Sequence, residues 1–129
     1  MNINTKANIY IAGHNGMVGS SIFRALQKKG YKNLIVKNRN QLNLESQKEV
    51  NDFFKKNSIE IVINAAAKVG GILANNDYPY HFLMKNLQIQ NNLIDSALSS
   101  KVEKFIFLGS SCIYPKYATQ PIKEDYLLS

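Results

Sequence analysis

Short apolar runs alternate along this chain with longer segments of helical periodicity. The apolar runs predict strands at residues 8–12, 34–37, 60–65 and 104–108. Apolar residues at helical spacing, with a Ser46–Glu49 capping box before the second segment, predict helices at residues 17–29, 46–54 and 79–99. Near-continuous apolar strands joined by helices predict an α/β fold: a Rossmann-type doubly wound parallel sheet, incomplete, with about four strands and three helices.

The apolar positions also predict which helix faces pack inward. In the first helix they are Val18, Ile22, Ala25 and Leu26, and Gly30 is the expected stop. In the third they are Leu83, Leu87, Ile94 and Leu98, which share one face. After Pro115 the periodicity fades, and a loop is expected there.

Composition narrows the class of protein. The chain has 129 residues, of which 45% are hydrophobic and 19% charged, as in a globular domain. Its net charge of +7 comes from lysines that stand singly or in pairs, which is typical of a solvated exterior and not of a nucleic-acid-binding stripe. No apolar run is long enough to span a membrane, and no metal site is predicted. The single cysteine, Cys112, is consistent with a reducing cytoplasm.

A glycine loop, Gly13-His14-Asn15-Gly16-Met17-Val18-Gly19, directly follows the first strand and opens the first helix. Glycines in such a turn let the backbone approach a pyrophosphate, and the helix N-terminus offers free N–H groups to the phosphates. The alternative is a set of chance glycines in a tight turn. His14 either contacts phosphate or faces solvent. No Gly-x-x-x-x-Gly-Lys sequence is present, so an NTPase loop is not supported.

The end of the second strand indicates which dinucleotide is bound. An acidic residue there would bind the ribose 2′-hydroxyl of NAD, but the stretch reads Lys37-Asn38-Arg39-Asn40 and has no carboxylate before Glu45. Arg39 can instead pair with a 2′-phosphate, which favours NADP(H). The alternative for Arg39 is a solvent-facing loop residue.

Four segments together carry a family resemblance. They are residues 11–20, residues 40–44, the string Ala65-Ala-Ala-Lys-Val-Gly-Gly-Ile72 with residues 74–76, and Phe107-Leu-Gly-Ser-Ser-Cys-Ile-Tyr-Pro-Lys116. With them the chain resembles the GDP-L-fucose synthases, which are extended short-chain dehydrogenases/reductases. That family carries out 3,5-epimerisation and then NADPH-dependent 4-reduction of GDP-4-keto-6-deoxy-D-mannose. The resemblance covers all of this chain but only about the first two-fifths of a family member.

The resemblance implies a set of cofactor-binding residues. The glycine loop meets the pyrophosphate, Arg39 lies beside the 2′-phosphate, and the segments after the second, third and fourth strands line the cofactor. The set is Gly13, His14, Asn15, Gly16, Met17, Val18, Gly19, Arg39, Asn40, Gln41, Leu42, Asn43, Leu44, Ala65, Ala66, Ala67, Lys68, Leu108, Gly109, Ser110 and Ser111.

The resemblance also implies two catalytic residues. Ser110 would hydrogen-bond the substrate 4-keto oxygen and stabilise the charge that develops there. Its alternative is a hydroxyl that caps local backbone, a role that suits Ser111 better. Cys112 would transfer protons during epimerisation. Its alternative is a small buried hydrophobe.

One expected pair is missing. In the family a tyrosine acts as general acid and a lysine four residues later lowers its pKa, but none of the seven tyrosines here has such a lysine. Residues 1–129 are therefore expected to form a truncated NADP-binding domain without a substrate domain. It would be inactive and aggregation-prone by itself, because the fourth strand has an open edge. At full length a homodimer that binds a GDP-sugar is expected.

Three alternatives stay open at this point. The first is a non-catalytic NADP-binding module, and the second is another extended-family nucleotide-sugar epimerase or reductase. The third is a basic nucleic-acid-binding protein, against which the dispersed charge argues.

Overall fold

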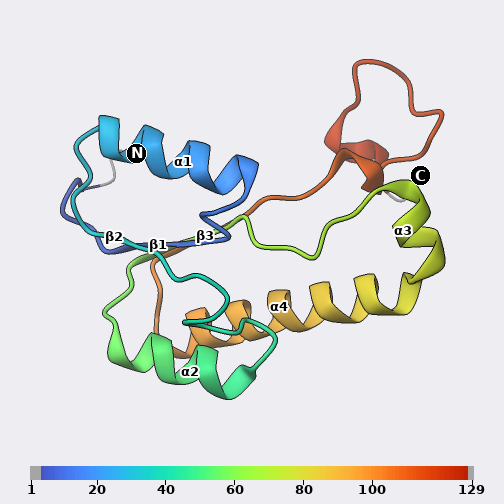
Figure 1. The fold of residues 1–129 in the computed structure, drawn as a ribbon. Coiled ribbons are helices and arrows are strands. Elements are labelled where there is room, and N and C mark those ends of the chain that lie inside the picture. The colour runs from blue at the N-terminus through green and yellow to red at the C-terminus, as the bar shows by residue number, and fades with distance from the viewer. Residues whose placement is uncertain (1–3, 128–129) are drawn as a thin grey trace.

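The computed structural model describes residues 4–127, and four parallel strands form its single sheet (Figure 1). Their order is β2-β1-β3-β4, with Ile9 of β1 opposite both Leu34 of β2 and Ile61 of β3. The strands are β1 (Ile9–Ala12), β2 (Leu34–Ile35), β3 (Ile61–Asn64) and β4 (Lys104–Phe107). All four expected strands are confirmed, although β2 has two residues where four were expected.

Helices cover both faces of the sheet, so the doubly wound α/β fold is confirmed. In Figure 1 α1 lies over one face, and α2 and α4 lie over the other. The helices are α1 (Met17–Lys28), α2 (Gln47–Lys56), α3 (Ile72–Asp77) and α4 (Pro79–Ser99), with short 3-10 helices η1 (Ser111–Ile113) and η2 (Glu124–Tyr126). Three of these α-helices were expected. Helix α3 was not, because six residues are too few to show a helical period.

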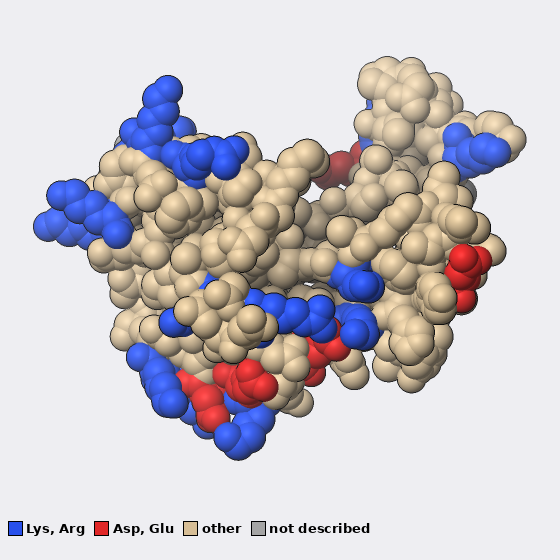
Figure 2. All heavy atoms as spheres, in the orientation of Figure 1, with Lys and Arg blue, Asp and Glu red and all other residues tan. Residues whose placement is uncertain are grey.

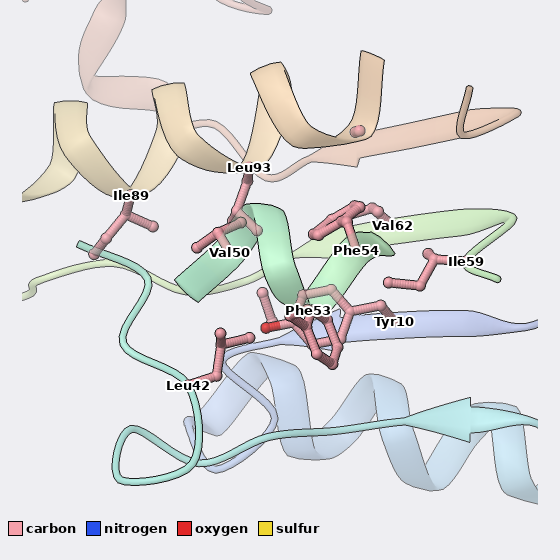
Figure 3. Close-up of a cluster of buried hydrophobic side chains, with 11 residues drawn as sticks. Tyr10, Leu42, Val50, Phe53, Phe54, Ile59, Val62, Ile89 and Leu93 are labelled. Carbon is pink, nitrogen blue, oxygen red and sulfur yellow. The ribbon is translucent and has the colours of Figure 1, made fainter. Parts of the chain in front are cut away.

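Alternation along the strands sends side chains to two separate cores. In β1, Ile9 and Ile11 point to the α1 side, while Tyr10 and Ala12 point to the side of α2 and α4. Figure 3 shows the core on the side of α2 and α4, in which Tyr10 lies against Phe53 and Phe54 of α2. The Tyr10 and Phe53 rings have centroids 4.8 Å apart. This aromatic cluster holds α2 on the sheet.

The inward face of α1 differs in part from the expected one. Ile22, Phe23 and Leu26 pack on the sheet, but Val18 is 47% exposed and Ala25 is also exposed. Phe23 therefore packs inward, and Val18 and Ala25 do not. The stop is confirmed: Gly30 has φ +84°, just after the C-cap Lys29.

The expected inward face of α4 is wrong. Leu83, Leu87, Ile94 and Leu98 are all exposed, with Leu98 at 78%. The buried residues of α4 are Phe82, Ile89, Asn92, Leu93, Ser96 and Ala97. Asn92 donates to the Leu44 carbonyl at 2.9 Å and Ser96 donates to Asn51 at 2.5 Å. These bonds satisfy two buried polar side chains, so the helix turns a partly polar face toward α2.

The start of α2 follows the capping box only in part. The Ser46 hydroxyl accepts from the Glu49 N–H at 3.4 Å, as expected of an N-cap. The Glu49 carboxylate, however, accepts from the Asn43 N–H at 3.0 Å, since the Ser46 N–H is already bonded to the Asn43 carbonyl. The first turn of α2 is thereby fastened to the loop that follows β2.

No helix within residues 4–127 is long and apolar enough to cross a membrane. In the same range no three histidine, cysteine, aspartate or glutamate side chains gather as a metal site would require.

Candidate functional site

The strand order creates a crevice at one end of the sheet. After β1 the chain crosses to β2 on one side, and after β2 it returns to β3 on the other side of β1. Connections that leave β1 and β3 in opposite directions open a ligand-binding crevice at the carboxyl ends of those strands. A cavity of about 490 Å³ lies there. Its lining is Gly13, His14, Asn15, Gly16, Met17, Val18, Lys37, Asn38, Arg39, Leu42, Asn43, Leu44, Glu45, Ala65, Ala66, Ala67, Lys68, Val69 and Ile89.

Two glycines of the loop are required by the packing of the chain itself. Gly13 has φ +79°, and a Cβ there would lie 2.6 Å from the Ala65 carbonyl oxygen. A Cβ on Gly19 would overlap the Gly13 carbonyl. The loop after β1 therefore lies directly against the segment after β3, and α1 starts close to both. Gly19 is buried behind the cavity and does not line it.

The N-terminus of α1 faces the cavity without a cap of its own. Its N-cap is Gly16, which makes no side-chain hydrogen bond to the helix, and the first turn contains no acidic residue. Main-chain N–H groups in a first turn have no partner inside the helix, and the helix dipole places partial positive charge there. Gly16, Met17 and Val18 line the cavity, and Met17 is 86% exposed. This end of the cavity suits an anion such as a pyrophosphate.

The loop after β2 forms the opposite end of the cavity. The Asn38 side chain accepts from the N–H groups of Asn40 and Gln41 at 3.0 and 3.1 Å, which fixes a tight turn. Asn40 and Gln41, predicted to bind cofactor, lie outside the lining. Buried Leu42 and the half-buried Leu44 form an apolar wall with Ile89 of α4.

Charged side chains gather at this end. The guanidinium of Arg39 is 2.5 Å from one carboxylate oxygen of Glu45. The Lys85 ammonium of α4 is 3.5 Å from the other. Lys37 also lines the cavity. The Arg39 side chain is 68% exposed, as expected of a solvent-facing loop residue, and it also forms an ion pair with Glu45.

The segment after β3 forms the third wall. The buried side chain of Asn64 accepts from the Ala66 N–H at 3.0 Å. The Asn86 side chain of α4 bonds twice to Lys68: it accepts from the backbone N–H at 2.7 Å and donates to the carbonyl at 3.0 Å. The Lys68 ammonium lies 5.6 Å from the centre of the Phe82 ring. Side chains of α4 therefore hold this wall in place.

The predicted residues after β4 lie outside the cavity lining. They are Leu108, Gly109, Ser110, Ser111 and Cys112. The Ser110 hydroxyl accepts from the Cys112 N–H at 3.2 Å and is the N-cap of η1. The expectation that Ser111 suits the capping role better is therefore wrong. Cys112 is exposed with a free thiol, so the buried-hydrophobe alternative is also wrong.

Five lining residues were not among the predicted binders. Lys37 and Asn38 lie within three residues of the end of β2, and Glu45 is the first carboxylate after the strand, so position alone was a usable signal. Val69 extends the predicted segment by one residue. Ile89 belongs to α4, and no local pattern shows that this helix reaches the cavity.

The surface charge is spread out. Figure 2 shows Lys and Arg side chains over separate parts of one face, with acidic side chains between some of them, and no continuous basic stripe. This arrangement is typical of a solvated exterior.

The strand order, the glycine loop and the cavity over β1 and β3 define a Rossmann-type domain. Residues 9–129 match the model of the NAD dependent epimerase/dehydratase family, and the chain belongs to that family.

The expected resemblance to GDP-L-fucose synthases is confirmed. The chain is 54% identical to GDP-L-fucose synthase 1 of Arabidopsis thaliana over 95% of its own length and 38% of that protein. It is 50% identical to the GDP-L-fucose synthase of Escherichia coli (strain K12) over 96% of its length and 39% of that protein. The solved structure of a GDP-mannoheptose C4 reductase from Campylobacter jejuni with NADP bound is 40% identical, with a TM-score of 0.93 over 98% of this chain and 40% of that one. The chain thus spans about two-fifths of the length of these relatives.

Proposed function

We propose that this chain is the NADP(H)-binding portion of a GDP-L-fucose synthase. The whole enzyme would convert GDP-4-keto-6-deoxy-D-mannose to GDP-L-fucose by 3,5-epimerisation and NADPH-dependent 4-reduction. The observation that carries the proposal is the cavity, with an uncapped helix N-terminus at one end and Arg39 at the other. The second candidate is a reductase for a different GDP-sugar, because the chain is also 40% identical to the mannoheptose reductase. It ranks second because the identity to the fucose synthases is higher, at 50–54%.

The residues present fit a phosphorylated dinucleotide. The N–H groups at the start of α1 would hold the pyrophosphate, and Arg39 with Lys37 would meet a 2′-phosphate. Leu42, Leu44 and Ile89 offer an apolar surface to an adenine ring. Bound NADPH would supply the hydride for the 4-reduction.

Ser110 and Cys112 would contact the keto sugar of the substrate. The oxygen of Ser110 accepts one hydrogen bond from the Cys112 N–H, and its own hydrogen stays available as a donor. A donor aimed at the 4-keto oxygen would stabilise the negative charge that develops during reduction. The exposed thiol of Cys112 would exchange protons at the carbons beside the ketone.

A chimera tests this assignment. This chain would replace the matching 39% of the Escherichia coli synthase, whose remainder would complete the enzyme. We expect NADPH oxidation that depends on GDP-4-keto-6-deoxy-D-mannose and yields GDP-L-fucose. Ser110→Ala should lower kcat by about 10²-fold, and Cys112→Ser should lower epimerisation by at least about 10²-fold. Ser99→Ala, at an exposed position near the end of α4, is the control and should retain activity.

Two outcomes would contradict the proposal. One is a folded chimera that binds NADPH but oxidises none with this keto sugar. The other is equal loss of activity in Ser110→Ala and Ser99→Ala, since a shared loss would not indicate the loss of a specific donor.

A further inference from the structure

One end of the cavity contains a network of three charged side chains from three elements. Arg39 belongs to the loop after β2, Glu45 directly precedes the N-cap of α2, and Lys85 belongs to α4. Glu45 is shared: one of its carboxylate oxygens is 2.5 Å from Arg39 and the other is 3.5 Å from Lys85. Arg39 and Glu45 both line the cavity.

The carboxylate of Glu45 is the more firmly placed partner. Its side chain is 22% exposed, against 68% for Arg39. Its backbone N–H donates to the Asn43 side chain at 3.1 Å, and the preceding carbonyl, of Leu44, accepts from Asn92 at 2.9 Å. The exposed guanidinium therefore reaches to a carboxylate that the loop and α4 hold in position.

Such a carboxylate affects the two dinucleotides differently. A 2′-phosphate would share Arg39 with Glu45, which already accepts from one guanidinium nitrogen, Nη2, and the carboxylate repels the negative charge of the phosphate. An unphosphorylated ribose has a 2′-hydroxyl, which can donate a hydrogen bond to a carboxylate. Lys85 neutralises part of the charge on Glu45 and so limits the repulsion.

We propose that Glu45 is a specificity-determining residue that competes with the 2′-phosphate for Arg39. The chain therefore binds both NADP and NAD, and its preference for NADP is reduced. This inference rests on the proposed function, since it assumes a dinucleotide in the cavity. It adds a residue that acts against the cofactor preference that Arg39 alone would give.

The test is calorimetric titration of the full 129-residue chain with NADP⁺ and with NAD⁺. Glu45→Gln should lower the Kd of NADP⁺ about fivefold, which is the upper range for an exposed ion pair, and leave the Kd of NAD⁺ the same or higher. Glu45→Ser removes the carboxylate differently and should change the ratio of the two constants in the same direction. The control is Asp52→Asn, which removes one negative charge from the exposed Lys48–Asp52 pair on α2 and should leave the ratio unchanged.

Repeating the titration in an Arg39→Ala chain shows whether Glu45 acts through Arg39. In the Arg39→Ala chain the Glu45→Gln change should alter the NADP⁺/NAD⁺ ratio less than about twofold, because coupled residues do not give additive effects. Weaker NADP⁺ binding by both Glu45 variants would overturn the inference, since Glu45 would then be orienting Arg39 for the phosphate. An unchanged ratio would overturn it too, while the proposed function would stand. A wild-type chain that binds neither nucleotide would contradict the proposed function and the inference with it.

Discussion

Single polar side chains shape the cavity more than its sequence motifs indicate. Asn86 is the clearest case, because one amide group holds both the N–H and the carbonyl of Lys68. Those two bonds connect the wall after β3 to α4. Without them, the main chain of Lys68 would lose both of its hydrogen bonds to the Asn86 side chain.

Asn86→Ala should therefore weaken nucleotide binding. Loss of both bonds lets the wall adopt other conformations, and we expect the Kd of NADP⁺ to rise about three- to tenfold. Asn91→Ala, an exposed asparagine on the same helix, is the matched control and should bind like wild type. Calorimetry gives the comparison, and circular dichroism checks the folding of each variant. Equal affinity in the two variants would show that the clamp does not matter for binding.

Buried Tyr10 makes the free energy of unfolding depend on pH in the alkaline range. Burial raises the pKa of the Tyr10 phenol above its ordinary value of 10.0. Below about pH 10 the phenol is protonated in both the folded and unfolded chains, so its contribution to stability is complete. At higher pH the unfolded chain loses the proton first, and the free energy of unfolding falls by up to about 1.4 kcal/mol per pH unit.

Tyr10→Phe removes that titration while keeping the ring that packs on Phe53 and Phe54. Urea unfolding at about pH 8 and about pH 11 should show a smaller loss of stability in the variant than in wild type. Equal losses would mean that other groups cause all of the alkaline destabilisation.

At the scale of elements, the hydrophobic pattern of α4 does not indicate which face of the helix is buried. Its large aliphatic residues at 83, 87, 94 and 98 are exposed, while Asn92 and Ser96 are buried with partners on other elements. Hydrophobicity alone selects the wrong face, because it counts Asn92 and Ser96 as outward. Only their partners, Leu44 and Asn51, make burial of those polar groups acceptable.

Two substitutions separate the faces of α4. Leu93 is fully buried, so Leu93→Ala should lower the free energy of unfolding by about 2–5 kcal/mol. Leu98 is 78% exposed, so Leu98→Ala should change it by less than about 0.5 kcal/mol. Denaturant unfolding of the two variants provides the measurement. A larger effect at Leu98 than at Leu93 would contradict the observed orientation.

At the scale of the whole molecule, β4 is an edge strand with apolar side chains near solvent. Within residues 4–127 it pairs with β3 alone, and Phe107 is 49% exposed. Open parallel edges with exposed apolar residues promote pairing between chains. The expectation that the isolated chain aggregates stays a prediction.

Phe107→Lys tests that prediction, because a charged side chain on an edge strand opposes pairing between copies. We expect less concentration-dependent light scattering from the variant than from wild type. Ile122→Lys places the same charge on an exposed apolar residue outside the sheet and should have a smaller effect. If the two variants scatter alike, net charge and not the strand edge controls association.

The parts of the cavity that could be predicted are local in sequence. Gly13 to Val18, Arg39, and Ala65 to Lys68 line it, and each stretch directly follows a strand or its turn. The contribution of Ile89 was not visible, since it depends on where α4 lies. The ion pair between Glu45 and Arg39 was not visible either, since it depends on how the loop folds. Binding by the residues after β4 stays a prediction, because the structure places them outside the cavity.

The amino-acid sequence by itself determined the order of strands and helices, the doubly wound sheet and the family. These follow from periodicity, glycines and contiguous motifs, all of which act between near neighbours in the chain. Only the tertiary structure decided which face of α4 is buried, that Asn86 holds the wall at Lys68, and that Glu45 engages Arg39. Each of those depends on a hydrogen bond or ion pair between different elements, and such partners meet only after the chain has packed.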